Sequence, residues 1–192
     1  MSKNWVCPDV SFVVVYDANV LYPNTLRDLL IRIAQAGLVQ AKWTDQILDE
    51  VDGALRRKRP DIAEDKLARR RALMNDAVPD RLVTGYERLI PVLSLPDEKD
   101  RHVLAAAIRA KAQVLVTDNI QHFPADYLAE WDIDPKTADD FVVDQVHLNR
   151  QLVYGAVQRI ADSRKNPPVT VADVLQQLEN SGIQQGVAML RG

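Results

Sequence analysis

Two aspartates of this chain directly follow short apolar runs, a position from which a carboxylate can bind a catalytic metal. Asp17 comes after the run from Ser11 to Tyr16, and Asp118 comes after the run from Ala112 to Thr117. Both runs are rich in β-branched residues, which is typical of central strands buried on both faces of a parallel sheet. Because the carboxyl ends of parallel strands form the binding crevice of an open sheet, we expect both carboxylates to face that crevice.

Two further acids are expected at the same place. Asp100 lies on the helical face that carries Val103 and Leu104, and Glu50 borders the apolar stripe of its own predicted helix. Four inward-facing carboxylates repel one another and lose hydration unless a cation binds them. Hard oxygen donors without a cluster of Cys or His suit Mg²⁺ or Mn²⁺ rather than Zn²⁺. The pattern therefore predicts a divalent-metal site.

Each acid taken alone also has a purely structural explanation. Asp17 could cap the helix that follows it, and Asp97 with Asp100 could form an ordinary helix cap. Glu50 could be a surface residue beside an apolar stripe. The combination of all the acids in this order is more specific than any one of them.

The elements that must position these acids alternate along the chain. Predicted strands cover residues 11–16, 38–43, 88–95 and 112–117. Predicted helices begin near Pro23, Thr44, Ile62 and Asp97, and Gly37 and Pro60 end the first two. Strands that alternate with helices indicate an α/β fold with a parallel sheet and right-handed crossovers.

The pattern changes after Pro135. A long helix with a broad apolar face is predicted over residues 137–161, and shorter helices follow the cap at Thr170 and the break at Ser181 and Gly182. We divide the chain into residues 1–135 and a C-terminal helical extension, residues 136–192. The apolar face could complete the fold, form a homodimer interface or dock a partner protein. We favour packing on the core, with partner contacts made by the acidic or distal part of the extension.

Composition sets limits on the class of protein. The chain has 192 residues, a formal net charge of −3, 47% hydrophobic residues and one cysteine, Cys7. This length and apolar share suit one compact domain with an appendage. A lone cysteine cannot form an internal disulfide, and no apolar run approaches the roughly 20 residues of a membrane span. We expect a cytoplasmic protein without a membrane segment.

The small net charge conceals two opposed segments. Residues 118–144 carry eight acids against one lysine, and residues 56–71 carry eight basic residues against three acids. A basic segment is often only a solvated helix face, but beside an acidic metal site it suits a phosphate-bearing substrate.

Four motifs resemble those of PIN-domain nucleases, and especially the VapC-like toxins of type II toxin–antitoxin systems. They are VVYDANVL (14–21), TDQILDEV (44–51), DEKDRHVLAAA (97–107) and VLVTDNIQHFP (114–124). The resemblance covers about residues 11–125. It implies a PIN-like three-layer fold, in which helices flank a parallel central sheet. The segment after Pro135 also resembles the C-terminal extension of some VapC-like toxins.

The resemblance also implies roles for individual residues. Asp17, Glu50 and Asp100 fall on the metal-binding acids of the family, and Asn19 and Thr117 fall on polar positions that orient the site.

The last acidic or amide position of the family corresponds to Asn119, one residue beyond Asp118. We expect both to line the site, with Asp118 as the stronger charge donor and fourth metal ligand. His122 stands where the family often has Asp, and we do not expect it to be a ligand. We expect His102 and His147 on the surface or behind the ligands.

The activity implied by the resemblance is that of a divalent-metal-dependent endoribonuclease, the toxin of a pair whose cognate antitoxin blocks the acidic crevice. Two ions would activate a water and clamp the scissile phosphate, leaving a 5′-phosphate and a 3′-hydroxyl. The basic residues would then bind RNA phosphates without reading sequence. They are Arg56, Arg57, Lys58, Arg59, Arg69, Arg70 and Arg71.

Three other functions remain open at this point. They are a catalytically silent RNA- or protein-binding scaffold, a structure-specific nuclease in RNA processing, and a phosphoacceptor domain. The last has little support, because no lysine follows a fifth strand in the expected place.

Overall fold

A computed structural model describes residues 11–192, so that Cys7 lies outside the described residues. Four parallel strands form the central sheet in the order β2-β1-β3-β4. They are β1 (Phe12–Tyr16), β2 (Val39–Lys42), β3 (Val114–Val116) and β4 (Asp134–Lys136). The two central strands, β1 and β3, are the apolar runs that precede Asp17 and Asp118.

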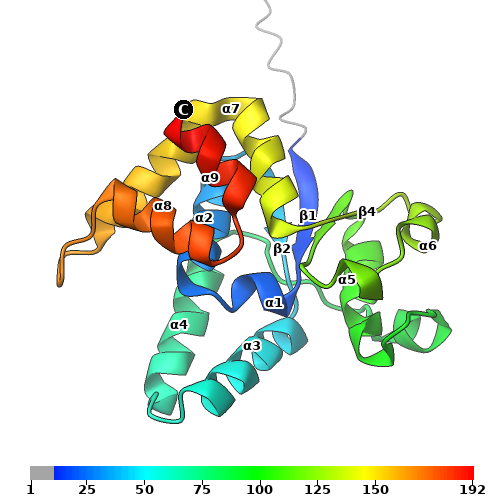
Figure 1. The fold of residues 1–192 in the computed structure, drawn as a ribbon. Helices are drawn as coiled ribbons and strands as arrows, with labels where there is room; N and C mark the ends of the chain where they lie inside the picture. The colour runs from blue at the N-terminus through cyan, green and yellow to red at the C-terminus, as the bar shows by residue number, and fades with distance from the viewer. Residues whose placement is uncertain (1–10) are drawn as a thin grey trace, which may run out of the picture.

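Helices cover both faces of this sheet. α2 (Asn24–Gln35) and α7 (Ala138–Ser163) lie on one side, and α5 (Arg101–Ala110) lies on the other (Figure 1). Their buried stripes meet the strands in one apolar core, which includes Leu30, Val103 and Phe141. The observed architecture is the α/β, PIN-like three-layer fold predicted from the sequence.

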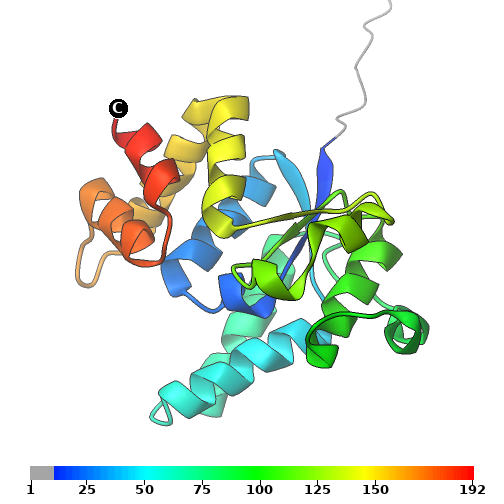
Figure 2. The ribbon, with the colours of Figure 1, turned by 45° about the vertical axis from the view of Figure 1, so that its right-hand side comes forward.

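Two helices project away from the sheet. α3 (Asp45–Lys58) and α4 (Glu64–Ala77) form a hairpin below the carboxyl edge, as Figure 2 shows. Thr44 begins α3 as predicted, because its hydroxyl accepts a hydrogen bond from the Ile47 amide at 3.0 Å. The remaining short elements are α1 (Ala18–Leu21), η1 (Glu87–Val92), η2 (Glu98–Asp100), η3 (Ile120–His122) and α6 (Ala125–Ala129).

One predicted strand is wrong. Residues 88–95 were expected to extend along the sheet, but Glu87–Val92 forms the 3-10 helix η1. Leu93 and Leu95 are buried while Val92 is exposed, and this alternation imitates a strand. Pro91 lies inside the segment and has no N–H to donate to a neighbouring strand, which favours the helical turn.

The edge strand β4 was not predicted, because the division between the core and the C-terminal extension was placed at Pro135, inside this strand. The strand lies at the sheet edge and pairs with β3 on one side only. A proline is tolerated there, since its missing N–H faces away from the partner strand.

The predicted C-terminal extension is entirely helical. It consists of α7, α8 (Val171–Asn180) and α9 (Gln184–Arg191). The side chain of Asp173 closes a capping box with Thr170 at the start of α8, as expected. A break at Asn149 divides α7, and the Asn149 side chain accepts a hydrogen bond from the Leu152 amide at 3.0 Å.

The extension packs on the core, as favoured from the sequence. α7 lies along α2, and Phe141 meets Tyr16 edge-on with ring centroids 5.8 Å apart. Within residues 11–192, none of the helices combines the length and the apolarity needed to cross a bilayer.

Candidate active site

Three polar residues form a closed hydrogen-bonded group at the carboxyl edge of β1 and β3. The Thr117 hydroxyl donates to Asp17 Oδ2 at 2.7 Å, and Asn19 Nδ2 donates to the same oxygen at 2.8 Å. Asn19 Nδ2 also lies 2.9 Å from Thr117 Oγ1. The resemblance assigned orienting roles to Asn19 and Thr117, and both side chains hold the Asp17 carboxylate in one position.

The environment of Asp17 opposes its negative charge. The residue is only 4% exposed, and burial is the largest cause that raises the pKa of its carboxyl to about 6. Hydrogen bonds from Thr117 and the Ala18 amide lower this pKa, whereas the nearby carboxylates of Asp100 and Glu50 raise it. A cation bound among these three acids would relieve both the repulsion and the loss of hydration.

Glu50 projects from α3 into the same region. Its Oε1 lies 2.7 Å from Nε2 of His102, which belongs to the first turn of α5. His102 is buried, whereas 43% of the Glu50 side chain is exposed. The prediction for His102 was a position on the surface or behind the ligands. The structure places it in the interior, in contact with Glu50.

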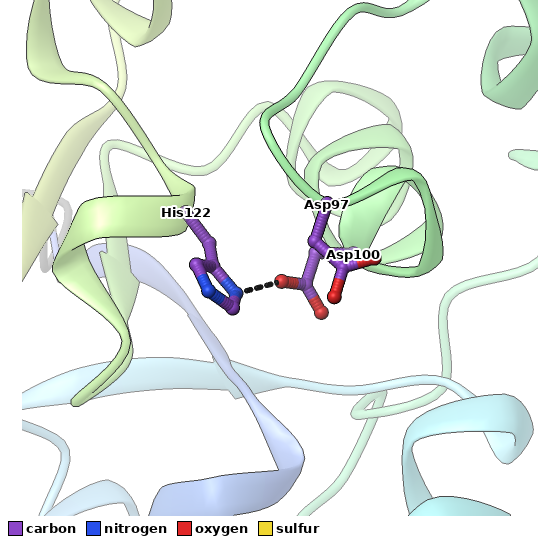
Figure 3. Close-up of side chains that lie close together, drawn as sticks. All are labelled: Asp97, Asp100 and His122. Carbon is purple, nitrogen blue, oxygen red and sulfur yellow. Dashed lines mark hydrogen bonds and ion pairs between the residues drawn. The ribbon is translucent and has the colours of Figure 1, made fainter.

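Asp100 belongs to a compact group with Asp97 and His122 (Figure 3). His122 Nδ1 lies 2.7 Å from Asp100 Oδ2, and potential metal-binding atoms of all three residues lie within 4.8 Å of one another. Asp97 also accepts a hydrogen bond from the Lys99 amide at 2.9 Å, so that it caps η2. The contact between His122 and Asp100 was not predicted, because the two residues belong to separate elements.

Asp118 and Asn119 take different directions after β3. Asp118 Oδ1 accepts a hydrogen bond from the Ala138 amide at 3.0 Å, at the start of α7. Asn119 lines the cleft that contains Asp17, and Asp118 does not belong to this lining. Asp118 and Asn119 were both expected to line the site, and of the two only Asn119 lines the cleft.

The cleft has a volume of about 720 Å³ and brings acids and bases together. Asp17, Glu50 and Asp100 line it as predicted, and Asp97 and Asp49 add two more carboxylates. Basic and aromatic side chains also line it, namely Arg57, Lys58, Lys99 and Tyr22. The Lys58 ammonium lies 4.8 Å from the centre of the Tyr22 ring.

The seven basic residues predicted to bind RNA fall into three groups, of which the last is Arg69 alone. Only Arg57 and Lys58 line the cleft. Four others pair with acids in ways that shape the α3–α4 hairpin. Arg56 pairs with Glu64, Arg59 with Asp61, Arg70 with Asp52, and Arg71 with Asp45 and Asp49.

A signal for part of this pairing exists in the sequence. Asp45, Asp49 and Asp52 recur at steps of three and four residues, so that they share one face of α3. A short connection folds α4 back against α3, and Arg71 reaches this face from α4. Arg69 is exposed on α4 outside the cleft lining.

Two family models match the sequence of this chain. Residues 13–121 match the family model described as PIN domain, which is more than half of the chain. The chain belongs to the PIN-domain family. Residues 138–192 match a second model, described as VapC50 C-terminal domain, and this range coincides with α7 to α9.

A curated relative has VapC50 in its own name, as the second family model does. The protein named "Putative ribonuclease VapC50" from Mycobacterium tuberculosis (strain ATCC 25618 / H37Rv) is 38% identical to this PIN-domain protein over 106 residues. The match covers 53% of this chain and 62% of the relative, so that it spans less than two thirds of the relative's length. No solved structure matches the chain significantly. The predicted resemblance to VapC-like PIN proteins with a C-terminal extension is confirmed.

Proposed function

We propose that this PIN-domain protein is a divalent-metal-dependent endoribonuclease that acts as the toxin of a toxin–antitoxin pair. The observation that carries the proposal is the convergence of Asp17, Glu50 and Asp100 on one cleft whose rim carries Arg57 and Lys58. The relative's name, "Putative ribonuclease VapC50", supports RNA as the substrate.

The donor set of the cleft fits a hard divalent cation. Carboxylate oxygens come from α3, from the end of β1 and from the turn before α5, and Asn119 adds an amide oxygen. Burial is the main cause that raises the pKa of Asp17, and the negative charges of Asp100 and Glu50 raise it further, which favours a cation among the three acids. Asp17, Glu50 and Asp100 would hold Mg²⁺ or Mn²⁺, which would supply an activated water and charge neutralisation at the scissile phosphate.

The residues of the chain have separate tasks in this reaction. Asn19 and Thr117 hydrogen-bond to the Asp17 carboxylate and hold its side chain in one rotamer, facing the cleft. Arg57 and Lys58 neutralise RNA phosphates on either side of the scissile bond. Backbone phosphates are the same in every sequence, and these contacts therefore give affinity without sequence preference.

The decisive experiment compares the wild-type protein with Asp17→Asn. Purified protein is incubated with RNA in EDTA, Mg²⁺ or Mn²⁺, and fragment ends are mapped. We expect cleavage only by the wild type and only with metal, with 5′-phosphate and 3′-hydroxyl products. Equal cleavage by the two proteins, or cleavage in EDTA, would contradict the metal mechanism.

The same pair of proteins tests the toxin role in cells. Expression of the wild type is expected to arrest growth, and expression of Asp17→Asn at the same level is not. Sequencing of RNA 5′ ends present only in the wild-type culture identifies the cleaved RNA. If both proteins arrest growth equally, the toxicity does not come from RNA cleavage.

A further inference from the structure

The environment of His102 differs from that of an ordinary core residue. The side chain is 2% exposed and comes from the first turn of α5, beside the apolar residues Val103 and Leu104. Its Nε2 contacts Glu50 Oε1 at 2.7 Å across the gap between α5 and α3. Its Nδ1 is buried and has no hydrogen-bond partner within residues 11–192.

The chemistry of the pair assigns the direction of the hydrogen bond. A carboxylate oxygen can only accept a hydrogen bond, so Nε2 of His102 carries the hydrogen and donates a hydrogen bond to Glu50 Oε1. Nδ1 then holds an unpaired lone pair at a buried position, which disfavours folding relative to an apolar side chain of similar size. Packing alone does not account for a histidine at this position, whereas a bond to Glu50 does.

Glu50 depends on this contact for its orientation. Its side chain is partly exposed, has three rotatable bonds, and has His102 as its hydrogen-bond partner within the described chain. Asp17 is held by Thr117 and Asn19, and Asp100 by His122. The carboxylates of Asp17, Glu50 and Asp100 therefore each have a hydrogen-bond partner of their own among the described residues.

We propose that His102 is a positioning residue that holds Glu50 in the cleft in the orientation that binds the divalent cation. Its bond occupies Oε1 and leaves Oε2 of Glu50 free to face the cleft. This inference rests on the proposed metal-dependent function. Partners that orient a metal-binding side chain typically contribute about 10-fold to 100-fold to metal affinity.

The test is Mn²⁺ binding by the full-length protein, measured by calorimetry and by electron paramagnetic resonance without RNA. His102→Leu removes the donor, whereas His102→Gln keeps an N–H at a similar distance from the backbone. His147→Leu is the matched control, because His147 is exposed on α7 outside the acidic cleft. Thermal unfolding without metal shows that each variant is folded.

We expect His102→Leu to weaken Mn²⁺ binding by about 10-fold to 100-fold without a loss of thermal stability. His102→Gln should recover most of this affinity, and His147→Leu should match the wild type. In a Glu50→Gln background, His102→Leu should have little further effect, since its contribution passes through Glu50.

The outcomes separate this inference from the proposed function. If the wild type binds no Mn²⁺ in the cleft, the proposed function and the inference both fail. If the wild type binds Mn²⁺ and a folded His102→Leu binds it equally well, only the positioning role fails. It also fails if folded His102→Gln is as weak as His102→Leu, or if the effects of His102→Leu and Glu50→Gln on binding simply add.

Discussion

Asp118 Oδ1 accepts a hydrogen bond from the backbone amide of Ala138 at 3.0 Å, which joins the end of β3 to the first residue of α7. The amides in the first turn of a helix have no partner within the helix, so an acceptor here stabilises the start of α7. Asp118 also donates its own amide to Asn19 Oδ1 at 3.2 Å. It thus links the C-terminal extension to the group that holds Asp17.

This contact leads to a prediction about Asp118, which sequence analysis expected to be the fourth metal ligand. Asp118→Asn keeps the acceptor for Ala138, so we expect Mn²⁺ affinity within a few-fold of the wild type and a stability loss below about 1 kcal/mol. Asp118→Ala removes the acceptor and should cost about 1 kcal/mol. Calorimetric titration and urea unfolding measure the two quantities. A loss of metal binding in Asp118→Asn as large as in Asp17→Asn would instead make Asp118 a ligand.

The buried charge of Asp17 predicts a pH-dependent stability of the metal-free protein. Burial raises the pKa of the Asp17 carboxyl from its ordinary value of 3.8 to about 6, so the folded state takes up a proton more readily than the unfolded state. Stability is therefore reduced above about pH 6, and the reduction disappears as the pH falls through 6 toward 4.

Asp17→Asn removes this effect. We expect the variant to be more stable than the wild type by about 1–3 kcal/mol at pH 7.5 in EDTA, with the difference shrinking below pH 6. The gain is limited because an amide cannot accept from both Thr117 and Ala18 as the carboxylate does. Urea unfolding from pH 4 to pH 8 gives the profile. The exposed Asp162→Asn is the control, and a difference between Asp17→Asn and wild type that is constant across this range would contradict the prediction.

The sequence predicted the central strands and the acids that follow them because both depend on local pattern. Val14 and Val15 belong to a run apolar at every position, which in an α/β chain means a strand buried on both faces. Asp17 and Thr117 then follow at the carboxyl edge by topology alone. The caps at Thr44 and Thr170 are equally local, since each involves residues three apart.

What the sequence did not predict depends on contacts between distant segments. His102 meets Glu50 across 52 positions, and His122 meets Asp100 across 22. No periodicity links such pairs. The 3-10 helix η1 was missed because the alternate burial of Leu93 and Leu95 has the period of a strand. The segment η1 packs against α5 and pairs with none of the strands β1 to β4.

The ion pairs of the α3–α4 hairpin predict which basic residues bind RNA. Arg57 and Lys58 line the cleft, whereas Arg56 and Arg59 are paired with Glu64 and Asp61. In the non-cleaving Asp17→Asn background, charge reversal of Arg57 and Lys58 to Glu should weaken RNA binding at least about tenfold. It should also lower the salt slope by roughly 1.4, since each phosphate contact to single-stranded RNA contributes about 0.7.

The matched control reverses Arg56 and Arg59 in the same background, with the same change in net charge. We expect a smaller loss of affinity and a smaller change in slope, because those guanidinium groups already face carboxylates. Filter binding at several salt concentrations measures both quantities. Equal effects of the two double variants would mean that RNA responds to the overall charge of α3 and not to the cleft.

Gly186 tests whether the extension and the PIN domain form one cooperative unit. It lies in α9 against α7, and a Cβ atom at this position would lie 2.7 Å from Val142 Cγ1. Val142 is fully buried, and it lies about one helical turn after Ala138, the residue of α7 that contacts Asp118. It follows Phe141, whose ring meets Tyr16, the residue before Asp17. Overpacking of this kind costs about 1–3 kcal/mol, more than the roughly 0.5–1 kcal/mol that alanine gains over glycine within a helix.

We therefore expect Gly186→Ala to lower the free energy of unfolding while thermal unfolding remains a single transition. Gly155→Ala in α7 is the control, because its Cβ would meet only the flexible end of Arg159 at 3.4 Å, and stability should be unchanged or slightly higher. Val142→Ala combined with Gly186→Ala should relieve the clash, so that the two changes are less costly together than their sum. Two separate transitions in Gly186→Ala, with the PIN-domain transition unchanged, would show that α9 docks on a domain that is stable without it.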